Sequence, residues 1–281
     1  MKPIKTHPAF THAKKFATAI PMVIALTCGA YANDAQSNDA QPNEAQSNDT
    51  QSEPKVPFDL EKFQPVLSGS RLHSPRTKNP IAVRAGRFGG YELPGRFYLG
   101  ESGTTMVIGT TNSGRDRSEL RHNATWSMMG EEKRYSARLR FDKPAALQGK
   151  SRLHLLQVYG QGEAKGPTVL VSWAGSWAAD GDEDNLGVYV KGSQSYSLGP
   201  RPDGFFNLDV SIKEGVLRIY MNNELKIEDD LSKQSYANGN FFFKTGAYHR
   251  GIKPHKVEFE ELTINLQGGT PDDADDEGEE E

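Results

Sequence analysis

Residues 206–223 read FNLDVSIKEGVLRIYMNN, and this stretch decides the fold class. Apolar and polar residues alternate from Phe206 to Ile212 and again from Val216 to Met221, which is the period of a β-strand with one buried face. Glu214-Gly215 and Asn222-Asn223 follow these two runs and are typical of tight hairpin turns. The stretch therefore predicts antiparallel strands joined by short turns.

Similar segments occur on both sides of this stretch. Helical periodicity is confined to short turns near Pro57–Phe63 and Asp230–Ser235. Gly, Asn and Asp separate the apolar runs, and many short strands with such spacing indicate an all-β sandwich or jelly roll. The further expected strands are Tyr135–Phe141, Leu153–Tyr159, Thr168–Trp173, Leu186–Val190, Asn240–Lys244 and Val257–Ile264.

The two ends of the chain differ in composition from its middle. Residues 1–32 begin with lysines, continue as an apolar run and end in Ala30-Tyr31-Ala32, which predicts a secretory signal peptide. Cys28 is the only cysteine and lies in this segment, so we expect neither a disulfide nor a thiol nucleophile in the mature chain. Residues 33–54 are predicted to be a disordered polar linker, and residues 270–281 an acidic disordered tail.

Residues 55–269 remain as a single expected β domain, and its charge differs from that of the whole chain. The chain has 33 basic and 37 acidic residues, of which the signal holds four bases, the linker five acids and the tail eight acids. The domain keeps 29 bases against 24 acids, a modest surplus that suits a polyanionic partner. No later apolar run is long enough to span a bilayer. We expect a secreted or periplasmic monomer that binds no nucleic acid.

Three segments place functional side chains two residues apart, and that spacing brings them to one face of a strand. Arg117, Glu119 and Arg121 share a face in RSELR, with Leu120 on the other side. Gln157 and Tyr159 do so in QVY, and Lys244 and Tyr248 do so in KTGAY. One sheet face lined by all three segments would hold these seven side chains together.

These segments occur in the order and context of a known family. RSELR, then QVY, then FFFKTGAYHR and a last strand VEFEELTI resemble the motifs R(S/T)ELR, Q(I/V)H and YFKAGxYxQ of the alginate lyase family, polysaccharide lyase family 7. The resemblance covers the chain from Phe58 to Leu266 in the right order. It implies a concanavalin-like β-jelly-roll sandwich of two antiparallel sheets, and a lyase that needs no cofactor or metal.

The resemblance also assigns roles to single residues. Arg121 and Gln157 match the groups that bind the substrate carboxylate, and Tyr248 matches the catalytic tyrosine. The residues that match the lining of the cleft are Arg117, Glu119 and Lys244.

Two positions depart from the family pattern. The family histidine, two residues after the glutamine, is Tyr159 here, so the second proton carrier is either absent or replaced by Tyr159 or His122. The family glutamine, two residues after the catalytic tyrosine, is Arg250, which indicates a more cationic substrate site. We therefore count Tyr159 with the catalytic candidates, and His122 and Arg250 with the substrate-binding ones.

The chemistry implied is β-elimination on a uronic-acid polymer. Neutralising the carboxylate of the sugar with Arg121 and Gln157 stabilises the charge that develops when the C5 proton leaves. In mannuronate and glucuronate the proton and the leaving oxygen depart from the same side, so one tyrosine can act as base and then as acid. In guluronate they depart from opposite sides, and a second group is needed.

Three functions fit the sequence. The first is an endo-acting alginate lyase with a preference for mannuronate. The second is a lyase for another uronan, such as glucuronan or an ulvan-type sulfated polymer, with Arg250 meeting the extra charge. The third is a carbohydrate-binding jelly roll without catalysis, which the presence of both Tyr248 and Lys244 disfavours.

Overall fold

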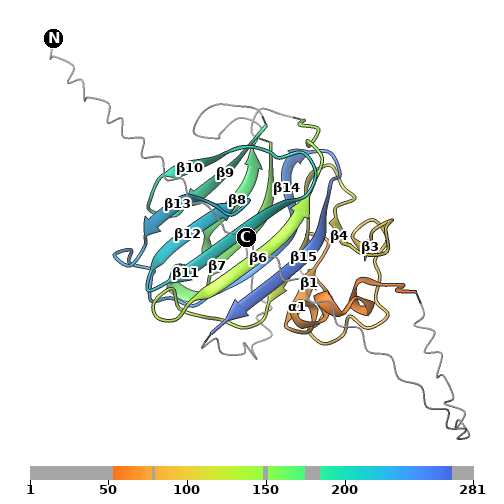
Figure 1. Cartoon of the computed structure of the whole chain (residues 1–281), viewed down its shortest axis with the longest axis horizontal. Helices are drawn as coiled ribbons and strands as arrows, with labels where there is room; N and C mark the ends of the chain where they lie inside the picture. The colour runs from red at the N-terminus through yellow and green to blue at the C-terminus, as the bar shows by residue number, and fades with distance from the viewer. Residues whose placement is uncertain (1–52, 78–79, 148–150, 175–183, 268–281) are drawn as a thin grey trace, which may run out of the picture. The chain divides into compact units, whose positions relative to one another are not determined.

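The computed structural model describes residues 53–77, 80–147, 151–174 and 184–267 (Figure 1). The expected signal peptide, the acidic tail and all of the expected linker except its last two residues lie outside the described residues. Within them, no helix has the length and apolar character that crossing a membrane requires.

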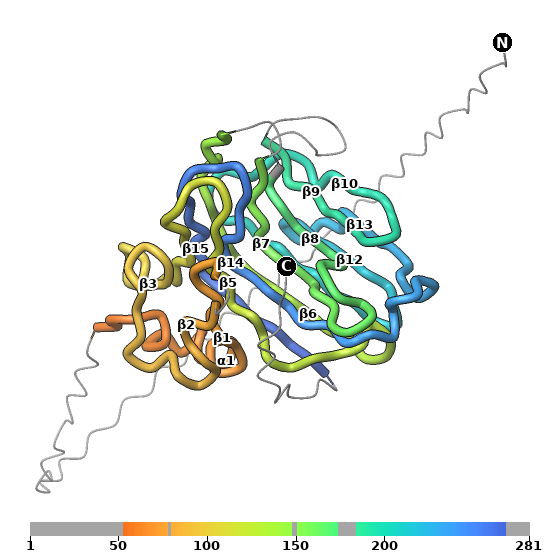
Figure 2. The backbone as a smooth tube through the Cα atoms, turned by 180° about the vertical axis from the view of Figure 1, so that it is seen from behind, coloured from red at the N-terminus to blue at the C-terminus, as the bar shows by residue number. Residues whose placement is uncertain are grey.

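Two antiparallel sheets face each other, as the all-β jelly-roll prediction requires. Figure 1 shows the seven-stranded sheet in front, and Figure 2, from behind, shows the eight-stranded one. The eight-stranded sheet has the order β10-β9-β8-β7-β14-β5-β1-β2 and the other the order β13-β12-β11-β6-β15-β4-β3. The strands of the eight-stranded sheet are β1 (Ser70–His73), β2 (Ile81–Val83), β5 (Gly114–His122), β7 (Arg152–Gly160), β8 (Gly166–Ala174), β9 (Asn185–Val190), β10 (Ser195–Pro200) and β14 (Phe241–Ile252).

The remaining elements complete the second sheet and its connections. The strands of the seven-stranded sheet are β3 (Phe97–Leu99), β4 (Met106–Gly109), β6 (Lys133–Arg140), β11 (Phe206–Lys213), β12 (Val216–Met221), β13 (Glu224–Asp230) and β15 (Lys256–Leu266). The short helices are η1 (Pro57–Asp59), η2 (Glu61–Phe63), α1 (Gln64–Ser68) and η3 (Gly162–Ala164).

The hairpins predicted from residues 206–223 are confirmed. β11 pairs with β12 from Leu208–Met221 to Lys213–Val216, and β12 pairs with β13 beyond the second turn. Glu214 and Gly215 have φ angles of 49° and 78°, and Asn222 and Asn223 have φ angles of 51° and 65°. Both turns therefore use two consecutive left-handed residues, which gives a hairpin the twist of its strands.

The core lies between the two sheets. Leu208, Val210 and Ile212 of β11 are fully buried, as the alternation in that segment predicts. A hydrogen bond of 2.9 Å joins the hydroxyls of Tyr135 in β6 and Thr245 in β14, and so links the two sheets through the core. Thr245 also donates to the backbone carbonyl of Leu155 in β7 at 2.9 Å.

Every strand expected from the sequence is present, but several others were missed. The segment expected to end at Lys244 continues to Ile252, so the whole tyrosine motif is part of β14. The strands β1 to β4, β10 and β13 were not expected, apart from the turn that opens β13. β1 and β4 are buried on both sides and show no alternation, and β2 and β3 have only three residues each.

Candidate active site

The three motif segments form neighbouring strands, with β14 between β5 and β7. Lys244 of β14 lies opposite both Arg121 of β5 and Gln157 of β7. Residues directly opposite in adjacent strands present their side chains on the same face. These three side chains therefore form one row across the sheet, on the face turned away from the core.

A second row crosses the sheet two residues further along. Glu119 of β5 lies opposite Gly246 of β14, and the Gln157 amide donates a hydrogen bond to the Glu119 carboxylate. That bond passes over β14, where Gly246 carries no side chain. Gly246 has φ +142°, and a Cβ there would come within 2.5 Å of the Ser118 carbonyl oxygen. Only glycine fits at this position, and it brings the amide and the carboxylate together.

The third row contains Tyr248, which lies opposite Arg117 of β5 and His154 of β7. The Tyr248 hydroxyl accepts two hydrogen bonds from Arg115, from Nε at 3.0 Å and from Nη2 at 2.7 Å. The rings of Tyr248 and His154 lie 5.3 Å apart. The phenolic oxygen therefore accepts charge-assisted hydrogen bonds from a guanidinium group.

The sheet face that carries these rows is called the motif face below. On it, Tyr159 lies beyond the first row, on the side away from Tyr248. Its ring stacks on Phe242 at 5.5 Å, and the Lys244 ammonium lies 4.3 Å from its centre. The Arg121 guanidinium lies 4.0 Å above the Phe242 ring. These contacts support the cations of the first row. In the pairing of β14 with β7, Tyr159 lies opposite Phe242, whereas Tyr248 lies opposite His154.

His122 is not on this face. In β5 it follows the alternation of Ser118 and Leu120, not that of the arginines. Its ring packs at Gly69, where a Cβ would come within 2.9 Å of Nε2, and its Nδ1 accepts a hydrogen bond from the Ala124 amide. The structure therefore does not place His122 where it could contact a substrate together with Tyr248.

His154 joins the face although it stands three residues before Gln157 and so has the wrong spacing. The register of β7 against β8 shifts between His154 and Leu156. The register of β14 against β7 shifts between Thr245 and Tyr248. Leu155 and Leu156 are both buried in the core, which is the mark of a β-bulge. Two consecutive leucines in LHLLQVY are the one sequence signal that could have revealed it.

Four other residues of this face were also missed. Arg71 and His73 of β1 lie opposite Arg121 and Glu119, and they extend the first and second rows. Arg115 and Arg152 lie opposite Arg250 from its two sides and form a fourth row. Strand pairing alone reveals these neighbours, because they come from segments without a recognisable motif.

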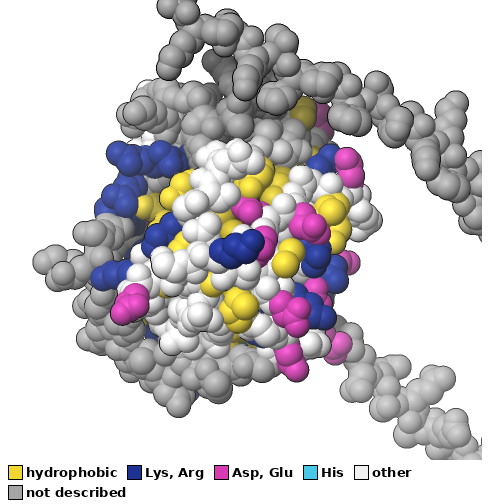
Figure 3. Space-filling model, turned by 90° about the vertical axis from the view of Figure 1, so that its left-hand side faces the viewer, with side chains coloured by type: hydrophobic (Ala, Val, Ile, Leu, Met, Phe, Trp, Pro, Cys, Tyr) yellow, Lys and Arg dark blue, Asp and Glu magenta, His cyan; other side chains and the backbone are white. Residues whose placement is uncertain are grey.

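Charge on this face is strongly one-sided. Arg121, Lys244 and Glu119 are each only about 1% exposed, and Glu119 is the one carboxylate in the four rows that the described strands form. In the view of Figure 3 acidic and basic side chains intermingle on the right, while basic ones gather at the upper left.

His154 is held in its neutral form. Burial, together with the charges of Arg152 and Arg115, lowers its pKa to about 3. Its Nδ1 lies 2.6 Å from the Ser172 hydroxyl of β8. A neutral ring beside Tyr248 adds no further positive charge to a site that already carries several.

A buried ion pair supports β5 on the side away from the motif face. Arg96 donates to Asp116 at 2.8 Å, and the backbone amides of Thr111 and Asn112 donate to the same carboxylate. Burial favours a higher pKa for Asp116, but the hydrogen bonds of Arg96 and of backbone amides outweigh it and leave the pKa below its usual value. Asp116 is adjacent in the chain to both Arg115 and Arg117, so this pair helps to fix the end of the strand that carries them.

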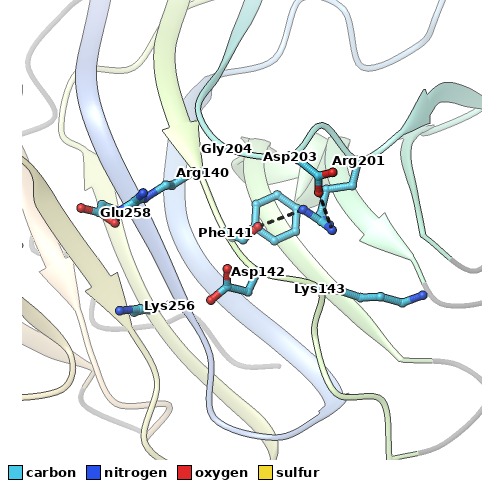
Figure 4. Close-up of a pocket in the computed structure, with 9 residues that line it drawn as sticks. All are labelled: Arg140, Phe141, Asp142, Lys143, Arg201, Asp203, Gly204, Lys256 and Glu258. Atoms are coloured by element: carbon cyan, nitrogen blue, oxygen red, sulfur yellow. Dashed lines mark hydrogen bonds and ion pairs between the residues drawn. The ribbon is translucent and has the colours of Figure 1, made fainter.

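A pocket of about 380 Å³ lies at the ends of β6 and β15 (Figure 4). Its charges are largely paired with one another, Arg140 with Glu258 at 2.7 Å and Arg201 with Asp203 at 3.5 Å. No residue of the three motifs lines it. Among the residues that the structure describes, no cluster of histidine, cysteine and carboxylate side chains could hold a metal ion.

The motif face can bind a carboxylate and move a proton. Arg121 and the Gln157 amide offer donors from two strands to one anionic group, with Lys244 between them. Tyr248 offers a hydroxyl whose oxygen is already paired with a guanidinium group. This combination suits removal of a proton next to a carboxylate.

Acid is expected to destabilise the fold through two buried histidines. Burial lowers the pKa of His122 to about 4, and the pKa of His154 is about 3. Because these values lie below that of an unfolded histidine, the unfolded chain binds protons first as the pH falls. The contribution of these histidines to the free energy of unfolding is fully present above about pH 6.5. It decreases below that pH, and for His154 the loss is about 3 kcal/mol at pH 4.

Urea unfolding between pH 7 and pH 4 measures this loss. The His154→Asn variant should be less stable at pH 7 but should lose less stability on acidification than the wild type. An equally steep loss in the variant would contradict the assignment to His154.

Comparison with known proteins places these features in context. The alginate lyase family model matches residues 58–265, which include all three motif strands. Curated protein sequences gave no match. The structure of alginate lyase AlyC3 in complex with dimannuronate has a TM-score of 0.66 at 20% identity, over 76% of this chain and 95% of that one.

Two further solved structures share the fold. The alginate lyase from Corynebacterium sp. has a TM-score of 0.59 at 15% identity, over 76% of this chain and 99% of that one. Alginate lyase AlgAT5 from polysaccharide lyase family 7 has a TM-score of 0.59 at 15% identity, over 75% of this chain and 98% of that one. At such identities these structures establish a common jelly-roll fold.

Proposed function

Because this chain belongs to the alginate lyase family, and is therefore a polysaccharide lyase that acts by β-elimination, we propose that it is exported and cleaves alginate within the polymer, preferring bonds at mannuronate. The observation that carries the proposal is the row of Arg121, Lys244 and Gln157, with Tyr248 on the same face.

The first step is neutralisation of the substrate carboxylate. Arg121 presents a planar fork of donors, and Gln157 is oriented by its hydrogen bond to Glu119. When the C5 proton leaves, negative charge moves onto the carboxylate oxygens. Donors that already point at those oxygens need no reorganisation, so they stabilise the transition state more than the bound substrate.

Tyr248 moves the proton. As a phenolate it takes the proton from C5, and as a phenol it returns a proton to the O4 that leaves. Arg115 holds the oxygen from one side at 2.7 Å and stabilises the phenolate, which is present before the first step and forms again after the second. The sugar is left with a C4–C5 double bond, and the new chain end carries the hydroxyl.

A single proton carrier favours mannuronate. Tyr159, which stands where the family has its histidine, contacts Phe242 and Lys244, whereas Tyr248 contacts Arg115 and His154. His154 is buried and neutral, and its ring lies 5.3 Å from that of Tyr248. This arrangement supports a mechanism in which Tyr248 acts alone, which is sufficient when the C5 proton and O4 lie on one side.

Cleavage within the polymer is supported by cations on both sides of Tyr248. Arg121 and Lys244 lie along the strands in one direction, and Arg152 and Arg250 lie in the other. A polyanionic chain can therefore extend past the catalytic tyrosine both ways. Export follows from the expected signal peptide in residues 1–32 and suits a polymer found outside cells.

Incubation with a panel of polymers tests the proposal. Purified protein should raise the absorbance of unsaturated uronate with alginate and polymannuronate, with little response to polyguluronate, and should release a ladder of oligomers early in the reaction. Cleavage of glucuronan or ulvan in preference to alginate would instead assign the enzyme to another uronan. Release of only the smallest product from the start would contradict endo action.

Removal of the Tyr159 hydroxyl is expected to have a small effect. If Tyr159 only supports Lys244 and Phe242 through its ring, Tyr159→Phe should keep kcat on polymannuronate within about threefold, far from the 10² to 10⁴ typical of a lost acid or base. Initial rates of the variant and the wild type on polymannuronate and polyguluronate provide the comparison. Efficient wild-type cleavage of polyguluronate that disappears in the variant would make Tyr159 the second proton carrier.

A further inference from the structure

Three arginines form a row across the sheet next to Tyr248. Arg250 of β14 lies opposite Arg115 of β5 on one side and opposite Arg152 of β7 on the other. The row is two residues beyond Tyr248, a distance of about 7 Å along the strands. It lies on the side of Tyr248 away from Arg121.

These side chains affect one another electrostatically. Burial and the charge of Arg250 lower the pKa of Arg152, and Tyr248 opposes this shift. Arg152 and Arg115 both act on His154. Like charges directly opposite in neighbouring strands destabilise a sheet, and a bound anion between them removes that cost.

We propose that Arg152 and Arg250, with Arg115, form an anion subsite that binds a negative group of the polymer on the far side of Tyr248 from Arg121 and Gln157. The inference rests on the proposed function, since it places the same polymer on the same face. The ligand is a carboxylate or a sulfate ester, both of which match the donors of a guanidinium group.

The subsite is linked to catalysis through Arg115. Its Nε and Nη2 already donate to the Tyr248 hydroxyl, so most contacts to the anion come from Arg152 and Arg250. Arg250 is exposed and accessible to a polymer, whereas Arg152 is partly buried. An anion in this row holds the polymer on the side of Tyr248 away from Arg121.

Arg250→Gln tests the subsite with little risk to folding, because the side chain is exposed. KM for polymannuronate should rise about tenfold, which corresponds to about 1.4 kcal/mol, while kcat stays within twofold. Arg218→Gln is the matched control: Arg218 lies on β12 of the other sheet, is paired with Glu228 at 2.8 Å and should change neither constant. Equal KM values for wild type, Arg250→Gln and Arg218→Gln would overturn the proposal.

Direct binding separates this proposal from the proposed function. In a Tyr248→Phe background, calorimetry with polymannuronate and with ulvan should show weaker binding when Arg250 is replaced, whether or not the wild type cleaves either polymer. A larger loss on ulvan identifies a sulfate ester as the ligand, and an equal or larger loss on polymannuronate identifies a carboxylate. Unchanged affinity for both polymers refutes the subsite, whereas a wild type inactive on every uronan refutes only the proposed function.

Discussion

Tyr248→Phe is expected to lower kcat on polymannuronate by at least about 10³-fold, while the affinity for the polymer stays nearly unchanged. Only the hydroxyl is removed, and with it the proposed carrier of the C5 proton. The ring remains, so the packing against His154 at 5.3 Å is kept. Rates from the absorbance of unsaturated uronate, together with binding measured by calorimetry, separate the two effects.

Tyr220→Phe provides the control. Tyr220 lies on β12 of the opposite sheet, so its loss tests whether any tyrosine hydroxyl affects the measured rate. We expect wild-type kinetics for it. Near-normal turnover by Tyr248→Phe would remove Tyr248 from the mechanism and leave the family assignment without its proton carrier.

Arg121→Lys is expected to lower kcat/KM by about 10²-fold, even though the positive charge is kept. A guanidinium group donates two parallel hydrogen bonds to a carboxylate, whereas an ammonium group acts as a point charge. Arg121 is also stacked 4.0 Å from the Phe242 ring, a contact that suits a planar cation. Arg138→Lys, at a partly exposed ion pair with Glu260 in the other sheet, should leave the kinetics unchanged.

The melting temperature of Arg121→Lys must be measured alongside its activity, because the side chain is almost fully buried. Activity within threefold of the wild type in a folded variant would show that charge alone, without the fork geometry, is sufficient at this position.

The residues that share this face because they alternate within one strand could be predicted from the sequence. Arg117, Glu119 and Arg121 share a face because β5 is regular over that span, and Lys244 and Tyr248 do so along β14. The same rule places His122 on the other side of β5, since it stands next to Arg121.

The rest depends on features that sequence alone does not display. Arg71 and His73 belong to a four-residue strand that is buried throughout and therefore shows no alternation. His154 reaches the face only because a bulge adds one residue to β7. The row of Arg115, Arg152 and Arg250 depends on the register of three strands that are far apart in the chain.

The buried hydroxyl of Thr245 has a consequence for how this enzyme can change over evolution. It bonds both to Tyr135 in the other sheet and to the Leu155 carbonyl, next to the bulge. If the bulge disappeared, β7 would slip by one residue on one side of it, and either His154 or Gln157 would turn into the core. The side chains of Tyr135 and Thr245 are buried in the core, not on the motif face, yet we expect substitutions there to change which side chains of β7 reach that face. Variants with altered specificity should therefore be sought in the core as well as on the surface that meets the polymer.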